Sequence, residues 1–234
     1  MSRLAVVIPT LNAAAGLPAA LASLSPAQRL GYLGPVIVSD GGSSDATLDI
    51  ARKAGCAIVT GAQGRGAQLA AGAGAARGQI TADDWLMFVH ADTVMQPGWA
   101  REAKAFMARH AGRDRAGYFR FALDDMSPAA RRLEAAVRLR CQLFALPYGD
   151  QALVINAGFY DRLGGYKPMP LFEDVDLVRR ITRARLEPLH SAAVTSAAKF
   201  RAEGYGRRSR RNLVLLARYF MGADPGRLAA AYRR

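Results

Sequence analysis

The sequence predicts an α/β fold, in which a doubly wound, mainly parallel sheet carries helices on both faces to give three layers. Short continuous apolar runs such as Leu4–Ile8 are typical of strands buried on both faces. Helical segments separate these runs, as expected where the strands are parallel. Asn12, Asp40 and Asp92 follow three of the strands. Because such sheets bind ligands beyond the carboxyl ends of their strands, we expect a ligand site at that edge.

The first half of the chain is predicted to alternate strands with helices. Asn12 offers a cap for the first helix, 43–45 starts the second, and Gly55 suits the end of the second. Gly64 and Gly66 open a third helix rich in Ala and Gly. The expected strands are 4–8, 36–38, 57–60 and 85–89, and the expected helices are 12–24, 43–54 and 64–77.

The second half mixes the two kinds of element. Leu133, Val137, Cys141 and Phe144 form one apolar stripe at helical spacing. The chain has no internal repeat and no low-complexity linker, so residues 1–234 are expected to form one domain. The expected strands are 117–123 and 152–155, and the expected helices are 127–146, 159–163, 173–183 and a terminal segment after 204–206.

Composition narrows the class of protein. Apolar residues make up 51% of the chain and charged residues 22%, which excludes disorder for most of it.

The location of the protein is predicted from three features. Cys56 and Cys141 belong to no Cys/His cluster, which favours reduced thiols. Pro9 interrupts the first apolar run too early for a signal peptide. The longest candidate span, 213–221, is far shorter than the roughly 18 residues that a bilayer requires. A soluble, cytoplasmic protein is therefore expected.

The net charge is the unusual feature of the composition. Thirty-two Lys+Arg against nineteen Asp+Glu leave +13, which points to an anionic partner: nucleic acid, an acidic membrane or a phosphorylated small molecule. Ten of the basic residues lie in 199–234, where the only acids are Glu203 and Asp224. Leu213 and Phe220 make this segment amphipathic, which suits peripheral binding to an anionic membrane. A solvated basic surface is the alternative.

His90 and Asp92 are the first candidate site residues. Residues two apart in an extended segment project to the same side, so both side chains address one point beyond the strand. A carboxylate there, beside a phosphate-bearing ligand, suits Mg²⁺ or Mn²⁺. The alternative is a turn aspartate next to a packed histidine.

Asp40-Gly-Gly-Ser-Ser is the second candidate. Its glycines allow a tight turn and close approach of a ring or ribose, and Asp40 can accept hydrogen bonds from a nucleoside. A helix-capping loop is the alternative. No dinucleotide fingerprint is present, because Leu69 and Arg77 stand where the third glycine belongs, and no phosphate-binding GxxxxGK[ST] loop exists. Nicotinamide and P-loop chemistry are therefore disfavoured.

Glu173 and Asp174 open the helix predicted at 173–183. Acids at a helix N-terminus are stabilised by the helix dipole, which is the structural interpretation. The functional interpretation makes Asp174 a general base facing a cleft, with Asp176 in a structural role.

Taken together, five segments resemble family 2 glycosyltransferases with the GT-A fold. A subgroup resemblance is also present, to bacterial members associated with arsenosugar biosynthesis and radical-SAM/selenodomain gene neighbourhoods, through His-Ala-Asp-Thr, Gly-Asp-Gln-Ala and an Arg-rich tail. The five segments are VVIPTLN ending at Asn12, SDGGS around Asp40, Gly64-Arg-Gly66, HADT around Asp92 and FEDVDL around Asp174.

The resemblance implies a single Rossmann-like domain with three parts: a nucleotide-sugar half (1–125), an acceptor and catalytic half (126–198) and a basic amphipathic end (199–234). It implies an inverting transfer from a UDP- or GDP-linked sugar to an unidentified acceptor hydroxyl. The implied donor-side residues are Pro9, Thr10, Asn12, Asp40 and Arg65; Asp174 is the implied base; Asp150, Gln151 and Glu173 are the implied acceptor-side residues; and Asp92 with His90 is the implied Mg²⁺ or Mn²⁺ site.

The chain departs from the family pattern at His90, which replaces the first acid of Asp-x-Asp. Imidazole is a poorer Mg²⁺ ligand than carboxylate. We therefore expect Asp92 to hold the metal together with the donor diphosphate, while His90 hydrogen-bonds a phosphate.

Three alternatives stay open. A nucleotidyltransferase shares the sheet and the metal carboxylate, but it usually has a Gly-rich loop with Lys where this chain has Pro9-Thr10-Leu11-Asn12. A basic nucleic-acid-binding protein is disfavoured, because it leaves the acidic residues unexplained. A catalytically inactive relative is the third, suggested by His90.

Overall fold

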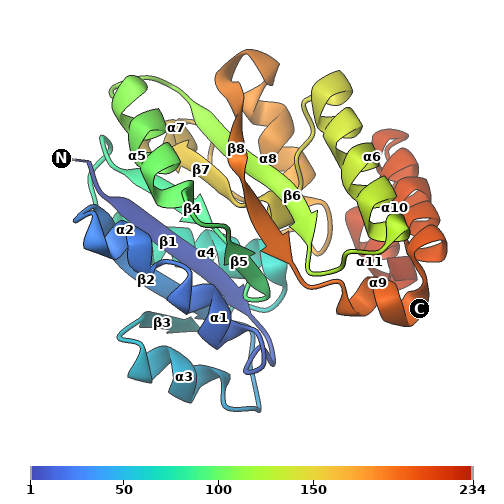
Figure 1. Ribbon diagram of the computed structural model, residues 1–234, viewed down its shortest axis with the longest axis horizontal. Coiled ribbons are helices and arrows are strands. Elements are labelled where there is room, and N and C mark those ends of the chain that lie inside the picture. The colour runs from blue at the N-terminus through green and yellow to red at the C-terminus, as the bar shows by residue number, and fades with distance from the viewer. Residues whose placement is uncertain (1, 233–234) are drawn as a thin grey trace.

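Eight strands form one sheet, and helices lie on both of its faces (Figure 1). The computed structural model describes residues 2–232. The strands are β1 (Leu4–Thr10), β2 (Leu33–Asp40), β3 (Ala57–Thr60), β4 (Trp85–Phe88), β5 (Thr93–Met95), β6 (Ala116–Leu123), β7 (Leu153–Asn156) and β8 (Leu186–Thr195). The helices are α1 (Leu17–Ala22), α2 (Ser25–Arg29), α3 (Thr47–Lys53), α4 (Arg65–Arg77), α5 (Trp99–Arg109), α6 (Pro128–Phe144), α7 (Ala157–Arg162), α8 (Glu173–Ile181), α9 (Ala198–Glu203), α10 (Tyr205–Phe220) and α11 (Pro225–Tyr232), with 3₁₀ turns η1 (Gly149–Gln151) and η2 (Arg183–Arg185).

The strand order is β3-β2-β1-β4-β7-β6-β8-β5. The first four strands are parallel, and β6 is also parallel to β8. β7 runs antiparallel to β4 and β6, and β5 runs antiparallel to β8. The protein is thus a single-domain α/β structure with a mostly parallel, curled sheet, which confirms the predicted fold class.

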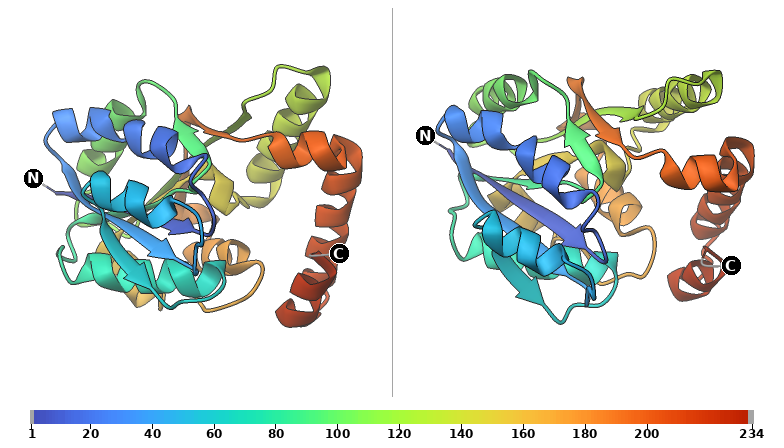
Figure 2. Two further views of the ribbon diagram at one scale, coloured as in Figure 1. Left: turned by 90° about the horizontal axis from the view of Figure 1, so that it is seen from below. Right: turned by 60° about the horizontal axis from the view of Figure 1, so that its bottom comes forward.

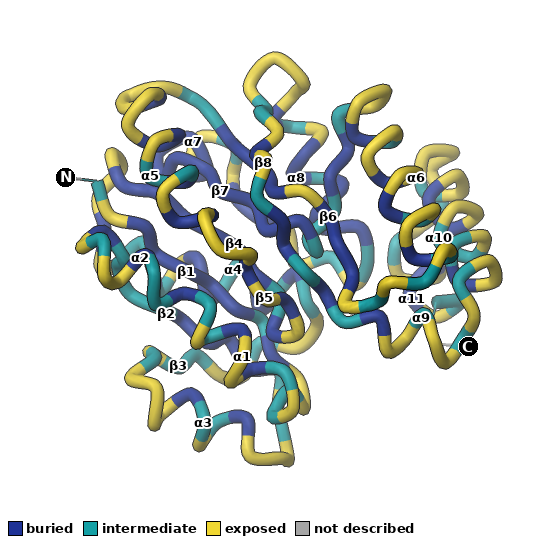
Figure 3. Tube along the Cα trace, viewed as in Figure 1, coloured by how far each residue is buried: buried dark blue, intermediate teal, exposed yellow. Residues whose placement is uncertain are grey.

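Two apolar layers sandwich the sheet. One lies under α1, α2, α3 and α5 and contains the large buried side chains Trp85, Trp99 and Phe106. The other lies under α4, α7 and α8 and contains Leu69 and Phe159. Figure 3 shows the result: the strands are mostly buried, and exposed residues lie mainly on helices and loops. The continuous apolar run of β1 is explained, because this strand is covered on both faces.

The helices α6, α10 and α11 lie beside the sheet rather than on its central strands (Figure 2). The inner side of α6 covers β6 through Val137 and Cys141. α10 and α11 cover α8, where Leu216 and Leu228 join a cluster with Val178. Within residues 2–232, no helix is both long and apolar enough to cross a membrane.

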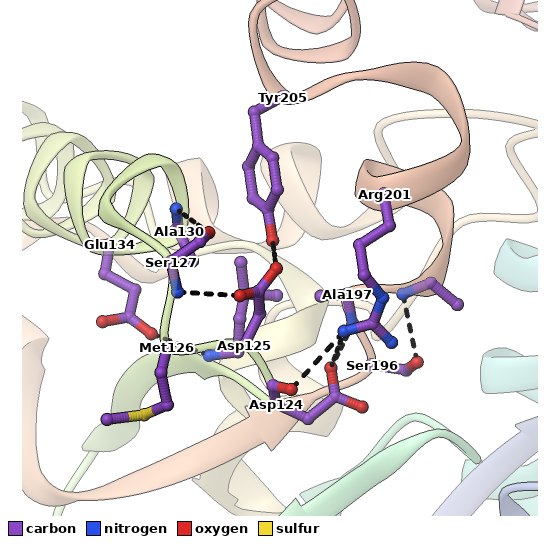
Figure 4. A network of polar contacts seen from close by, with 12 residues as sticks. Asp124, Asp125, Met126, Ser127, Ala130, Glu134, Ser196, Ala197, Arg201 and Tyr205 are labelled. Atoms are coloured by element: carbon purple, nitrogen blue, oxygen red, sulfur yellow. Dashed lines mark hydrogen bonds and ion pairs between the residues drawn. The ribbon is translucent and has the colours of Figure 1, made fainter.

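Polar contacts fasten α9 and α10 to the loop before α6 (Figure 4). The Tyr205 hydroxyl donates to Asp125 Oδ2 over 2.6 Å, and the Ala197 N–H donates to Asp124 Oδ1 over 2.6 Å. Ser127 caps α6, since its Oγ accepts from the Ala130 N–H, as the sequence predicts. These contacts fix the C-terminal helices against the rest of the protein.

The predicted start of the helix over 12–24 is wrong, although α1 lies within that range. Asn12 has φ +50° and caps no helix; its side-chain oxygen instead accepts a hydrogen bond from the Ser44 N–H. α1 begins only at Leu17, and the separate helix α2 has Pro26 in its first turn. Proline suits such a position, which explains why a second helix starts there.

Besides α2 and the 3₁₀ turns, four elements have no counterpart in the sequence prediction: β5, α5, β8 and α9. The apolar residues of α5, Trp99, Ala103, Phe106 and Met107, recur at helical spacing and carry a usable signal. β8 contains Pro188, which argues against a central strand in sequence reasoning. Pro188 lies where the pairing of β6 with β8 is irregular, so the missing N–H is tolerated.

Two glycines of α4 provide a stability test. A Cβ at Gly66 would lie 2.5 Å from the Met169 carbonyl oxygen and 2.6 Å from that of Lys167, so Gly66→Ala pushes the 167–169 loop away from α4. We expect a loss of about 1–3 kcal/mol, as for overpacking. Gly74→Ala is the matched control: Gly74 is exposed with no neighbour within 4 Å, and alanine should stabilise the helix by about 0.5–1 kcal/mol. Urea unfolding measures both; equal effects of the two substitutions would contradict the close approach at Gly66.

Candidate active site

Polar side chains gather at the carboxyl edge of the parallel strands. Thr10 ends β1, Asp40 ends β2, and His90 and Asp92 follow β4. The turn η1 and the first turn of α8 join them, because the Gly149 N–H donates to Asp174 Oδ2 over 2.8 Å. A Cβ added at Gly149 would lie 2.9 Å from His90 Nε2 and 3.5 Å from Asp174 Oδ2, so both side chains lie against this glycine. The predicted edge site therefore exists as a cluster.

Asp40 is buried and fully hydrogen-bonded within the protein. Its Oδ1 accepts from the hydroxyls of Thr10 (2.8 Å) and Ser43 (2.5 Å), and its Oδ2 accepts from the N–H groups of Gly42 (2.9 Å) and Ser43 (2.7 Å). Burial alone raises the pKa of Asp40, but these hydrogen bonds outweigh it and lower the pKa below its usual value. The carboxylate thus orders the 40–43 turn.

The ends of β1 and β2 are tied together by Gln68, which the sequence analysis missed. This buried residue of α4 donates through Nε2 to the carbonyl oxygens of Thr10 (2.6 Å) and Ser39 (2.9 Å). Asn12 joins the same edge through Ser43 and Ser44. Pro9 is half-buried in β1. The predicted donor-side residues on β1 and β2 therefore form one connected edge.

Arg65 begins α4 and points to the acids of α8. Its Nε donates to Glu173 Oε1. Burial disfavours its charge, but Glu173 and Asp174 outweigh that effect and hold the pKa of Arg65 above its usual value. Burial raises the pKa of Glu173, against the opposing effect of Arg65. Arg65 thus links the predicted donor and acceptor sides.

Two buried carboxylate oxygens near Asp174 have no hydrogen-bond partner within residues 2–232: Asp150 Oδ1 and Glu173 Oε2. Burial, with the nearby charge of Asp174, raises the pKa of Asp150 to about 6, although Arg140 opposes this. Unsatisfied buried acceptors cost stability, so a ligand that supplies hydrogen-bond donors here would be favoured. Hydroxyl groups of a ligand or a cation would satisfy them.

Asp174 itself is held in place on both oxygens. Oδ2 accepts from Gly149, and Oδ1 accepts from the Val175 N–H over 2.8 Å. Phe172, which precedes the helix, has φ +65°, a strained conformation for a residue with a side chain. Tyr118, Tyr148 and Tyr166 line a narrow cavity beside the carboxylate. Sequence reasoning missed these tyrosines.

Gln151 has a different environment from Asp150. It is buried, its Oε1 accepts from Cys141, Arg140 and the Tyr148 N–H, and its Nε2 donates to the Phe119 carbonyl over 3.1 Å. Its amide is therefore occupied in holding η1, the turn that carries Asp150.

His90 and Asp92 meet the requirements for a cation only in part. Asp92 is exposed, and its carboxylate makes no hydrogen bond or ion pair with the described residues. Burial, with the charges of Arg65 and Lys199, lowers the pKa of His90 to about 3, so its ring is neutral. Residues 2–232 contain no group of three or more His, Cys, Asp or Glu side chains arranged for a metal. An ion at Asp92 would need further ligands from a bound substrate.

The fold and the acidic cluster define the protein as an α/β protein with a ligand site at the carboxyl edge of its parallel strands. The family model for glycosyl transferase family 2 matches residues 5–138, so the chain belongs to that family. No curated protein matches the sequence closely enough to identify a relative.

Solved structures share the fold. TarS 1–349 from S. aureus, determined with UDP-GlcNAc, has a TM-score of 0.63 and 16% identity; the match covers 83% of this chain and 58% of that one. Glucosyl-3-phosphoglycerate synthase from Mycobacterium tuberculosis, determined with Mn²⁺, UDP and glucosyl-3-phosphoglycerate, has a TM-score of 0.51 and 17% identity, covering 91% of this chain and 79% of that one. The chain therefore spans less than two thirds of the TarS chain that it resembles.

The raised pKa of Asp150 gives a pH-dependent prediction. Because its pKa is about 6 in the folded protein and near 3.8 when unperturbed, the folded state favours the neutral acid, and this contribution to stability is lost as the pH rises through 6. Asp150→Asn should therefore raise Tm at pH 8 and change it little at pH 4. Scanning calorimetry at the two pH values measures this. A larger gain at pH 4 would show that Asp150 is stabilised as the carboxylate.

Proposed function

We propose that the protein is an inverting glycosyltransferase that moves a sugar from a UDP- or GDP-linked donor to an acceptor hydroxyl. Membership of glycosyl transferase family 2 supports the reaction class. The observation that carries the proposal is the Asp174 carboxylate, anchored by Gly149 and flanked by two buried carboxylate oxygens without partners. Two fold neighbours were determined with UDP-GlcNAc and with UDP, which supports a nucleotide-sugar donor.

In this proposal, residues 1–125 bind the donor and 126–198 hold the acceptor and the base. The nucleoside lies along Pro9, Thr10 and Asn12, with Asp40 ordering the turn beside it. Since Asp40 already accepts four hydrogen bonds, it acts by shaping the pocket as well as through any ligand contact. Arg65 places a fixed positive charge between the two halves.

Asp174 is the proposed base. It takes the proton from the acceptor hydroxyl as that oxygen bonds to the anomeric carbon, while the bond from this carbon to the diphosphate oxygen breaks and the bonding electrons leave with the diphosphate. Attack opposite the leaving group inverts the anomeric centre. Asp150 and Glu173 offer free acceptor atoms for hydroxyl groups of the sugar or the acceptor. Gln151 positions Asp150 by holding η1.

A divalent cation, Mg²⁺ or Mn²⁺, fits this edge at Asp92. The exposed, unpartnered carboxylate is free to ligate it, and the neutral His90 ring lies nearby as a phosphate hydrogen-bond partner or second ligand. A bound cation would neutralise diphosphate charge as the leaving group forms. One fold neighbour was determined with Mn²⁺ and UDP.

We also propose a cytoplasmic location, peripheral at the inner face of the membrane through the basic segment 199–234. The exposed arginines of α10 support this contact. Residues 233–234 lie outside the described part of the chain.

Asp174→Asn tests the base. We expect kcat to fall by about 10²–10⁴-fold, because general-base catalysis contributes that much, while donor affinity is retained. Asp176→Asn is the matched control: it lies in the same first turn but pairs with Lys167 and Arg180. Steady-state kinetics with calorimetric donor binding distinguish the two. A near wild-type kcat for Asp174→Asn would contradict the assignment of Asp174 as the general base.

Asp92→Ala tests the cation. If Asp92 ligates the metal, donor affinity should lose its dependence on Mn²⁺, while the metal-free affinity changes little. Isothermal titration with and without Mn²⁺ measures both. An unchanged Mn²⁺ effect in the variant would rule out Asp92 as the ligand.

A further inference from the structure

Exposed large apolar side chains are concentrated on two helices. Of the ten in residues 2–232, three lie on α6 and three on α10, and a seventh directly follows α10. These seven are Leu139, Leu143, Phe144, Leu213, Val214, Phe220 and Met221. Single exposed apolar residues are normal, but a concentration on neighbouring elements marks a binding surface.

The two helices are neighbours in the structure. α6 packs beside α10 along one side of the molecule (Figures 1 and 2). The end of α8 and the turn η2 that follows it contact both: Arg183 of η2 donates to the Leu143 carbonyl over 3.0 Å, and the guanidinium of Arg179 in α8 lies 5.1 Å from the centre of the Phe220 ring. The exposed sides of α6 and α10 are called the outer face below.

Five arginines of the outer face have no partner among the described residues. All are exposed, and none makes an ion pair or a side-chain hydrogen bond within residues 2–232. They are Arg132, Arg138, Arg207, Arg210 and Arg218. By contrast, Arg208 and Arg211 on the inner side of α10 both pair with Glu203. The one acid on the two helices, Glu134, is buried and accepts from the Leu123 N–H. The outer face thus carries only positive charge.

We propose that the outer face of α6 and α10 docks on an anionic lipid bilayer. Apolar side chains that enter the headgroup region and arginines that meet anionic lipids together explain the surface. A nucleic acid would leave the apolar residues unused, and a second copy of the chain would bring like charges together. The inference rests on the proposed peripheral location, but not on the proposed chemistry, and it extends the contact from segment 199–234 to α6.

The face lies directly behind the proposed catalytic helix. The inner side of α10 contributes Leu215 and Leu216 to the cluster that holds Val175 and Val178 of α8. Docking through the outer side therefore leaves that packing intact and fixes the orientation of Asp174 and the cavity beside it relative to the membrane.

Vesicle flotation of the full chain tests the proposal, with phosphatidylcholine vesicles that contain or lack phosphatidylglycerol. We expect binding only to the anionic vesicles, weakened by salt. Arg210→Glu with Arg218→Glu should bind more than about 30-fold more weakly, since the loss of each arginine costs about fivefold and each new glutamate adds repulsion from the anionic lipids. Leu143→Gln with Val214→Gln should also bind more weakly at unchanged net charge.

The matched control is Arg101→Glu with Arg113→Glu, which makes the same charge change at two exposed arginines on and after α5, at the opposite side of the molecule from α10 (Figure 1). It should keep most of the binding. Equal loss in the control, no binding of the wild-type chain, or a wild-type dimer that the Leu143 and Val214 variant dissociates would each overturn the proposal. Donor binding, measured on the same proteins, separates the two claims: vesicle binding without donor binding contradicts only the proposed chemistry.

Discussion

The hydrogen bond from the Gly149 N–H to Asp174 Oδ2 is the contact on which the site depends. It joins η1, which leads into β7, to the first turn of α8, and these two segments are far apart in sequence. A Cβ here would come 2.9 Å from His90 Nε2, so a larger residue requires the His90 ring to move. The strand β7 runs antiparallel in the middle of the sheet, so its start lies next to the end of β4. This single antiparallel insertion brings the α8 acids to the edge where the parallel strands end.

Much of the fold and the position of the candidate site were predictable from the sequence, because both depend on local patterns of residues. Continuous apolar runs identified the parallel strands, and polar residues after them identified the edge. Other features depend on distant contacts. Gln68 looks like any polar residue of a helix, yet it binds two strand ends. Asn12 has the residue type of a helix cap, but Ser44 holds it in a left-handed turn instead. β8 was missed because Pro188 is tolerated only at an irregular pairing that the partner strand creates.

The fold also shows where the acidic and the basic residues gather. The net charge of +13 does not describe the candidate site, where the four acids Asp92, Asp150, Glu173 and Asp174 gather and Arg65 is paired with Glu173. Five exposed arginines without a partner among the described residues lie on the outer helices instead. An acidic site suits hydroxyl-rich ligands and a cation, while an arginine-rich apolar face suits an anionic surface. The two regions share α8, whose first turn carries the acids and whose apolar side supports α10.

Donor binding tests the central claim most directly. Thermal unfolding of the full chain is measured with a panel of UDP- and GDP-linked sugars, each with and without Mn²⁺. A ligand at about 100 times its Kd adds roughly 2.7 kcal/mol to stability. For a chain of this length, that is a rise of about 5–10 °C in Tm. The account predicts such a rise, dependent on Mn²⁺, for one nucleotide class. No rise with any sugar nucleotide, with or without the metal, would contradict it.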